Sequence, residues 1–100
     1  MTIKIQDHDF DGPFADENDL DSKSGVYAVL CASGEGYSLV DCGESEDVRN
    51  RIVNHDRREC WLKNCNKDSL AFAAFYCDEF TRMAIEVGIR MKHELPCGKD

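Results

Sequence analysis

The sequence predicts a small α+β domain in which a three-stranded antiparallel sheet is flanked by helices, in the order ββα(α)βα. Apolar runs of strand length cover residues 25–32, 37–42 and 69–77. A short turn rich in glycine joins the first two runs, which is typical of a hairpin. Helical patterns follow the second and the third run.

The first 24 residues are predicted to form an acidic arm. Alternation of Ile3 and Ile5 with polar neighbours indicates at most a short edge strand over residues 2–6. Residues 7–24 are acidic and contain Gly12-Pro13, so we expect them to be irregular. The domain that carries the function is therefore expected to span residues 25–100.

The first strand of the hairpin is apolar on both faces. Alternation places Tyr27 and Val29 on one face and Val26 and Ala28 on the other. We therefore expect the sheet to be covered on both sides. The run over 69–77 is apolar enough to be the central strand of the three.

A helix is expected to start at Ser45, a good N-cap, and to run to about Cys60. Arg51 and His55 would then lie one turn apart on the same helix face. A second short helix is expected around Trp61.

The last helix is predicted over residues 79–94, and Pro96 stops it. Its apolar residues fall on one side, which we expect to face the core. These residues are Phe80, Met83, Ala84, Val87 and Met91.

The net charge of −8 argues against non-specific DNA binding. The charge is uneven, however, because residues 49–67 hold six basic and two acidic residues. The candidates for nucleic-acid contact in this stretch are Arg49, Arg57, Arg58 and Lys63. A solvated helix face explains the same pattern.

The six cysteines, with no secretory signal at the N-terminus, are expected to be reduced. Cys31, Cys42 and Cys77 lie in apolar runs and are interpreted as small core residues. A zinc or redox protein remains an alternative, although the chain has no C-x-x-C pair. We expect a cytoplasmic protein, and no apolar run is long enough to span a membrane.

Two short signatures frame the hairpin: Gly25-Val26-Tyr27 and Asp41-Cys42-Gly43. Arg51 and His55 follow them, and Glu86 comes later on a predicted helix ahead of Pro96. This arrangement resembles the GIY-YIG nuclease family over residues 25–96. The resemblance implies a small α+β domain that cuts phosphodiester bonds in DNA with a divalent ion, Mg²⁺ or Mn²⁺.

The resemblance also implies a role for each matching residue. Tyr27 would be the general base, and Arg51 would bind the scissile phosphate. Glu86 would hold the metal, and His55 would support proton transfer. The chemistry needs these types, because an anionic phosphodiester needs a cation and Mg²⁺ prefers carboxylate oxygens and water.

The second signature departs from the family, whose Tyr is replaced by Asp41. A phenol donates a hydrogen bond, whereas an ionised carboxylate cannot. Asp41 could be a second metal ligand, or Tyr37 or Tyr76 could reach the same space. The family's usual Asn after the terminal Pro is also missing, since Cys97 follows Pro96.

Two functions therefore stay open beside the cysteine-based alternative. The first is a metal-dependent GIY-YIG endonuclease, a hydrolase acting on DNA. The second is a catalytically inactive module of the same kind that binds nucleic acid or a protein. A lone module implies a targeting partner, dimerisation, or recognition of DNA structure, and the sequence does not decide between DNA and RNA.

Overall fold

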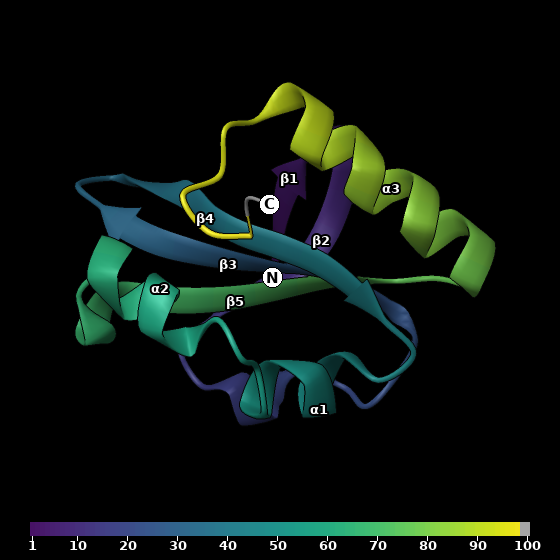
Figure 1. Cartoon of the computed structure of the whole chain (residues 1–100), viewed down its shortest axis with the longest axis horizontal. Coiled ribbons are helices and arrows are strands. Elements are labelled where there is room, and N and C mark those ends of the chain that lie inside the picture. Colours follow the sequence, from purple (N-terminus) through teal and green to yellow (C-terminus); the bar gives the residue numbers. More distant parts are fainter. Residues whose placement is uncertain (99–100) are drawn as a thin grey trace.

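The computed structural model describes residues 1–98, which form a five-stranded antiparallel sheet with helices on both faces. The strands are β1 (Thr2–Ile5), β2 (His8–Phe14), β3 (Gly25–Ser33), β4 (Gly36–Ser45) and β5 (Leu70–Tyr76). The helices are α1 (Val48–Val53), α2 (Arg58–Asn64) and α3 (Glu79–Lys92). The strand order is β1-β2-β5-β3-β4, and the sheet curves into a half-barrel with α3 on one side and α1 and α2 on the other (Figure 1).

The prediction of a three-stranded sheet is wrong, because the N-terminal residues add two strands. β1 and β2 form a hairpin whose two turn residues, Gln6 and Asp7, both have positive φ. β2 then pairs with β5, and Phe10 is fully buried while Asp9 and Asp11 are exposed. Residues 1–14 are therefore part of the sheet rather than an arm.

β2 is irregular where its proline lies. The pairing with β5 shifts register between Asp11 and Phe14, so Pro13 lies in the irregular part of the ladder. Gly12 has φ +123°, and a Cβ there would lie 2.8 Å from the carbonyl oxygen of Phe72. Only glycine fits this position without displacing backbone.

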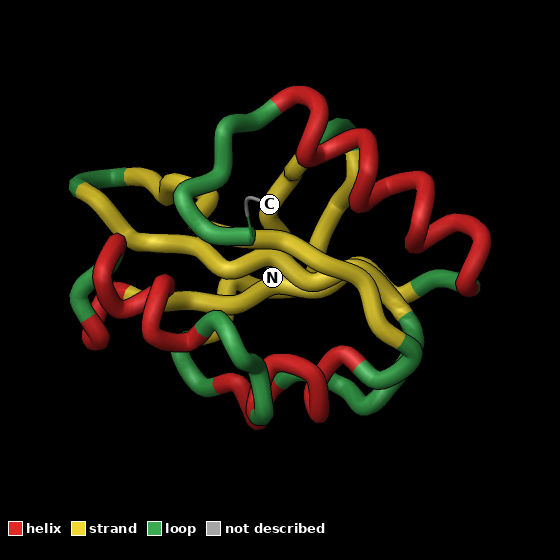
Figure 2. The backbone as a smooth tube through the Cα atoms, viewed as in Figure 1, coloured by secondary structure: helices red, strands yellow, loops and turns green. Residues whose placement is uncertain are grey.

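The helix expected from Ser45 to Cys60 is divided in two, with a loop between α1 and α2 (Figure 2). Asp47, rather than Ser45, caps α1 by accepting a hydrogen bond from the amide of Asn50. His55 lies in the loop, so it does not share a helix face with Arg51. The expected short helix around Trp61 is α2.

The two faces of the sheet carry separate cores. On the α1 and α2 side, Tyr27 and Val29 pack with Trp61. On the α3 side, Val26 and Ala28 pack in a wholly apolar layer. This division of the β3 residues is the one that strand alternation predicts.

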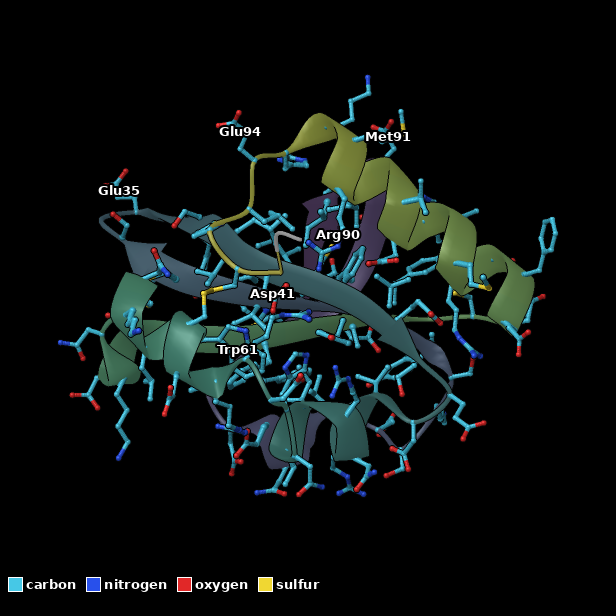
Figure 3. The ribbon with its side chains drawn as sticks, in the orientation of Figure 1. Glu35, Asp41, Trp61, Arg90, Met91 and Glu94 are labelled. Atoms are coloured by element: carbon cyan, nitrogen blue, oxygen red, sulfur yellow. A yellow bond between two sulfur atoms is a disulfide. The ribbon has the colours of Figure 1, made fainter. Side chains whose placement is uncertain are left out.

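The apolar residues of α3 do not face the core as expected. Ile85 and Ile89 are its buried residues. Phe80 is 86% exposed and Met91 82% exposed, on the outer side of the helix. Figure 3 shows Met91 projecting away from the sheet.

Four of the cysteines form disulfides, contrary to the expectation of reduced thiols. Cys31 is joined to Cys65, and Cys60 is joined to Cys97. Cys42 is a buried free thiol, which agrees with its interpretation as a small core residue. Within residues 1–98, no helix has the length and apolar character needed to cross a membrane.

Candidate functional site

A pocket of about 320 Å³ lies at the edge of the sheet beside β4. Residues from β3, β4, α1, α3, the loop before α2 and the C-terminal segment all line it. The lining residues are Tyr27, Gly43, Glu44, Arg51, Arg57, Glu86, Arg90 and Gly98. Because β4 is an edge strand, side chains from both faces of the sheet reach this space.

Three residues predicted from the sequence meet in this pocket. Tyr27 comes from β3, Arg51 from α1 and Glu86 from α3. These residues are far apart in the chain, so the fold rather than local geometry brings them together. Gly43, of the second signature, lies among them.

Tyr27 is positioned by a hydrogen bond with His55. The hydroxyl oxygen of Tyr27 lies 2.6 Å from Nε2 of His55, and Nδ1 of His55 accepts a hydrogen bond from the amide of Arg57. A neutral imidazole that accepts at Nδ1 carries its proton on Nε2. His55 therefore donates to the Tyr27 oxygen, and the phenol proton is free to point elsewhere.

Both groups are neutral near pH 7. Burial raises the pKa of Tyr27 to about 12, and the nearby Arg57 only partly opposes this. Burial, followed by the charges of Arg51 and Arg57, lowers the pKa of His55 to about 4. Tyr27 is thus a phenol that can donate a proton, and it would act as a base only when an added cation lowers its pKa.

Gly43 is required by the position of Tyr27. The two residues are paired across β3 and β4, and the Tyr27 ring lies directly over the Gly43 Cα. A Cβ at residue 43 would overlap the phenol oxygen and ring carbons. The glycine of the second signature therefore makes room for the tyrosine of the first.

Asp41 lies beneath the pocket and is fully buried. A register shift in the pairing of β3 with β4 leaves Val40 as an extra residue, so Val40 and Asp41 both contact the α1 and α2 side. Figure 3 shows Trp61 and Arg90 approaching Asp41 from opposite sides of β4.

The carboxylate of Asp41 accepts five hydrogen bonds. Oδ2 accepts from Nε of Arg57 and from Nε1 of Trp61, each at 2.8 Å. Oδ1 accepts from the Cys42 amide at 2.8 Å, from Arg90 at 3.0 Å and from Arg57 at 3.2 Å. Burial by itself would raise the pKa of Asp41, but these hydrogen bonds and the charge of Arg57 outweigh it and hold the pKa below its usual value.

These contacts bear on whether Asp41, which replaces the family's tyrosine, could be a second metal ligand. Its oxygens are sealed from solvent and taken by donors, so Asp41 is not placed to be a second metal ligand. Its carboxylate instead fixes two guanidinium groups, those of Arg57 and Arg90, on the pocket wall. Neither Tyr37 nor Tyr76 lines the pocket to replace the missing phenol.

Two arginines offer donors to the pocket. Arg57 uses Nε and Nη2 on Asp41, and its Nη1 makes no hydrogen bond to any residue in the described part of the chain. Arg51 uses Nη2 on the exposed Asp56, at 3.1 Å. With the Tyr27 hydroxyl, these groups give the pocket three donors suited to an anion.

Glu86 is the candidate for holding a metal ion. Its Oε2 accepts a hydrogen bond from Nε of Arg90 at 2.8 Å, and its Oε1 accepts none from residues 1–98. No cluster of three or more His, Cys, Asp or Glu among these residues could hold a metal. Mg²⁺ is commonly bound by one or two carboxylates and several waters. Glu86 fits that kind of site and not one with three protein ligands. Glu44 also lines the pocket, but its Oε1 is paired with Arg82.

The other basic residues predicted to contact nucleic acid lie away from the pocket. Arg49 contacts Ser22, and Arg58 forms an ion pair with Glu17. Lys63 is exposed on α2. The acidic N-terminal segment therefore occupies Arg49 and Arg58, which leaves Arg57 as the one of these four that lines the pocket.

Sequence reasoning missed Arg90 and Glu44 as lining residues and Trp61 as a partner of Asp41. Arg90 follows Glu86 by one helical turn, which is a signal for the Glu86–Arg90 pair. The sequence carries no local signal for the contact between Arg90 and Asp41, because that contact forms around an edge strand. Comparison of the chain with family models, with curated proteins and with solved structures finds no match.

Proposed function

We propose that the pocket binds a phosphodiester of DNA and hydrolyses it with the help of a divalent ion, in the manner of a GIY-YIG endonuclease. The observation that carries the proposal is the meeting of Tyr27, Arg51 and Glu86 in one pocket. These are the residues that the family resemblance selects for the base, the phosphate clamp and the metal ligand. Their convergence from three separate elements supports a common role.

Arg51 and Arg57 would bind the non-bridging oxygens of the phosphate. Guanidinium groups match the geometry of phosphate oxygens and stay charged at every relevant pH. Arg57 supplies the donor that the replaced tyrosine would have given, and Asp41 holds it in place. The substitution of tyrosine by Asp41 is therefore compatible with phosphate binding.

Tyr27 and His55 would handle the proton. The proton of His55 would remain on Nε2 and donate to the Tyr27 oxygen, where it would stabilise the phenolate that forms when Tyr27 gives up its own proton to solvent. That phenolate would then take a proton from the attacking water. Arg51 and Arg57 also favour that phenolate, since both lower the pKa of Tyr27. Binding of Mg²⁺ or Mn²⁺ at Glu86 would supply the further positive charge that polarises the phosphate and eases departure of the leaving oxygen.

Cleavage of plasmid and of labelled oligonucleotides in Mg²⁺ or Mn²⁺ tests the proposal. Arg51→Ala and Glu86→Gln should each lower the rate by about 10²–10³. Arg49→Ala and Glu94→Gln are matched controls, because Arg49 is half-buried, Glu94 is exposed, and neither residue lines the pocket. Cleavage that is equally fast in the Arg51 and Glu86 variants would come from a contaminant and would refute the assignment. RNA substrates run in parallel distinguish DNA from RNA.

A non-catalytic module that binds nucleic acid, or a protein partner, is the second candidate. The observation that favours it is the pKa of Tyr27, which at about 12 leaves no base ready near pH 7. This candidate predicts DNA binding in EDTA that Arg57→Ala weakens and Arg58→Ala does not, with no cleavage in any metal. Asp41→Tyr does not serve as a test, because it would leave Arg57 and Arg90 without their buried partner.

A cytoplasmic location stays a prediction. The two disulfides favour an oxidising environment instead, since the thiols of cytosolic proteins are usually kept reduced. Thiol titration of protein purified without reductant, with and without denaturant, would count the free cysteines. Two free thiols per chain match the structure, and six match the cytoplasmic expectation.

A further inference from the structure

The outer face of α3 is an uninterrupted apolar surface. Phe80, Met83, Val87 and Met91 are 86, 52, 53 and 82% exposed, and they follow each other at spacings of three and four residues. Ala84 and Gly88 complete the face, and open space lies above Gly88. These six residues are called the α3 stripe. Large contiguous apolar patches on a protein surface mark interaction sites.

We propose that the α3 stripe is the interface of a symmetric dimer, in which α3 packs antiparallel against α3 of a second copy. A two-fold axis beside the middle of the helix brings opposite ends of the stripe together. Phe80 then meets Met91 of the second copy, and Met83 meets Val87. Ala84 and Gly88 pair along the other flank, where their small size lets the two helices approach closely.

The charges at the ends of α3 favour the antiparallel arrangement. The N-terminal end carries Asp78 and Glu79, and the C-terminal end carries Lys92, all of them exposed. Antiparallel packing brings acidic ends toward basic ends, whereas parallel packing would place like charges together. Glu94 follows the helix and projects away from it (Figure 3).

The area is sufficient for a dimer that dissociates on dilution. The four large side chains expose roughly 500 Å² in each copy, so pairing removes on the order of 1,000 Å² from water. This value is close to the lower limit for specific interfaces. Because each copy has a net charge of −8, added salt should strengthen the dimer by screening the mutual repulsion.

The stripe lies on the side of α3 opposite its buried residues, Ile85 and Ile89. Glu86 and Arg90 lie on a flank of the helix and line the pocket. The dimer would therefore leave both pockets accessible. The proposal stands independently of phosphodiester hydrolysis.

Sedimentation equilibrium of the full chain tests the dimer directly. The wild type should approach twice the monomer mass at about 100 µM, and the dissociation constant should fall as salt is raised. Phe80→Glu and Met91→Glu should each raise that constant at least about tenfold. Leu62→Glu is the matched control, because Leu62 is 52% exposed on α2, outside the stripe. Circular dichroism verifies that the variants are folded.

Crosslinking tests the orientation. In a Cys77→Ser background, which removes the half-buried native thiol, a short thiol-reactive crosslinker should join Phe80→Cys to Met91→Cys when the two variants are mixed, and should join neither variant to itself. A wild type that stays monomeric overturns the proposal, even if it binds a different protein through the α3 stripe. A dimer that both glutamate variants leave intact, or a Phe80→Cys variant that crosslinks to itself, overturns it as well.

Discussion

The two faces of the sheet are filled in different ways. On the α1 and α2 side, the core contains a chain of buried polar contacts from Tyr27 through His55 and Arg57 to Asp41 and Trp61. On the α3 side, Val26, Ala28, Ile85 and Ile89 form an apolar layer. Because polar contacts are directional, the first face fixes the positions of individual atoms, while the second mainly excludes water. The pocket lies at the sheet edge where the polar network meets α3.

The largest loss of stability is expected when the buried polar contacts on the α1 and α2 side of the sheet are removed. Asp41→Ala removes the partner of Arg57, Trp61 and Arg90 at once and leaves partly buried charges unpaired. It should lower the free energy of unfolding by about 3–5 kcal/mol, measured by urea denaturation. Asp9→Ala is the control, since Asp9 is exposed and, among residues 1–98, pairs with Lys4 alone. Equal effects of the two substitutions would show that the network is not what holds this face.

The apolar side is tested by two neighbouring positions on α3. Ile89 is fully buried and Val87 is 53% exposed. Ile89→Ala should cost about 2–5 kcal/mol, because it leaves a cavity in a packed layer. Val87→Ala should change stability by no more than about 0.5 kcal/mol at a concentration where the protein is monomeric. A larger loss from the Val87 substitution would contradict the orientation of the helix.

The polar side should also make stability depend on pH through His55. Its pKa is about 4 in the folded protein and 6.5 in the reference state. Between these values the unfolded chain binds more protons, so the free energy of unfolding falls as the pH is lowered from about 6.5 to about 4. The loss should reach at most about 3 kcal/mol.

Urea denaturation across this pH range measures the His55 effect. His55→Gln should flatten the slope, and His93→Gln should not, because His93 is exposed. The same slope in the wild type and the His55 variant would assign the pH dependence to other groups.

The smallest effect concerns the contact between the two signatures. Gly43→Ala places a methyl group where the Tyr27 phenol lies and should cost about 1–3 kcal/mol. It should also change the NMR signals of the His55 ring, which the phenol contacts. Gly36→Ala is the control, because within the described part of the chain no atom beyond its two sequence neighbours lies within 4 Å of the added Cβ. Unchanged His55 signals in the Gly43 variant would argue that Tyr27 is not held between these residues.

The sequence predicts the parts of this molecule that depend on local pattern. Alternation around Tyr27 assigns the two faces of β3. Tyr27, Arg51 and Glu86, which line one pocket, are selected by the resemblance to the GIY-YIG family and not by local pattern. The short edge strand expected over residues 2–6 is confirmed as β1. β2 and its pairing with β1 escape prediction because the turn is Gln6-Asp7 rather than a glycine turn, and because Pro13 lies inside a strand.

The orientation of α3 is mispredicted for a different reason. It has apolar residues on both sides, and periodicity alone cannot say which side meets the sheet. The role of Asp41 could not be read either, because its partners come from the loop before α2, from α2 and from α3. Such contacts depend on the tertiary fold and leave no spacing in the sequence.

The two disulfides overlap along the chain. Cys60 lies inside the loop closed by Cys31 and Cys65, and Cys65 lies inside the loop closed by Cys60 and Cys97. A protease that cuts once anywhere between Cys31 and Cys97 would therefore produce two fragments that stay covalently joined. The nicked chain would migrate as one species on a gel until reductant is added. Arg51 and Glu86, which line the pocket, both lie between Cys31 and Cys97. A single cut in this span would therefore not release either residue from the molecule.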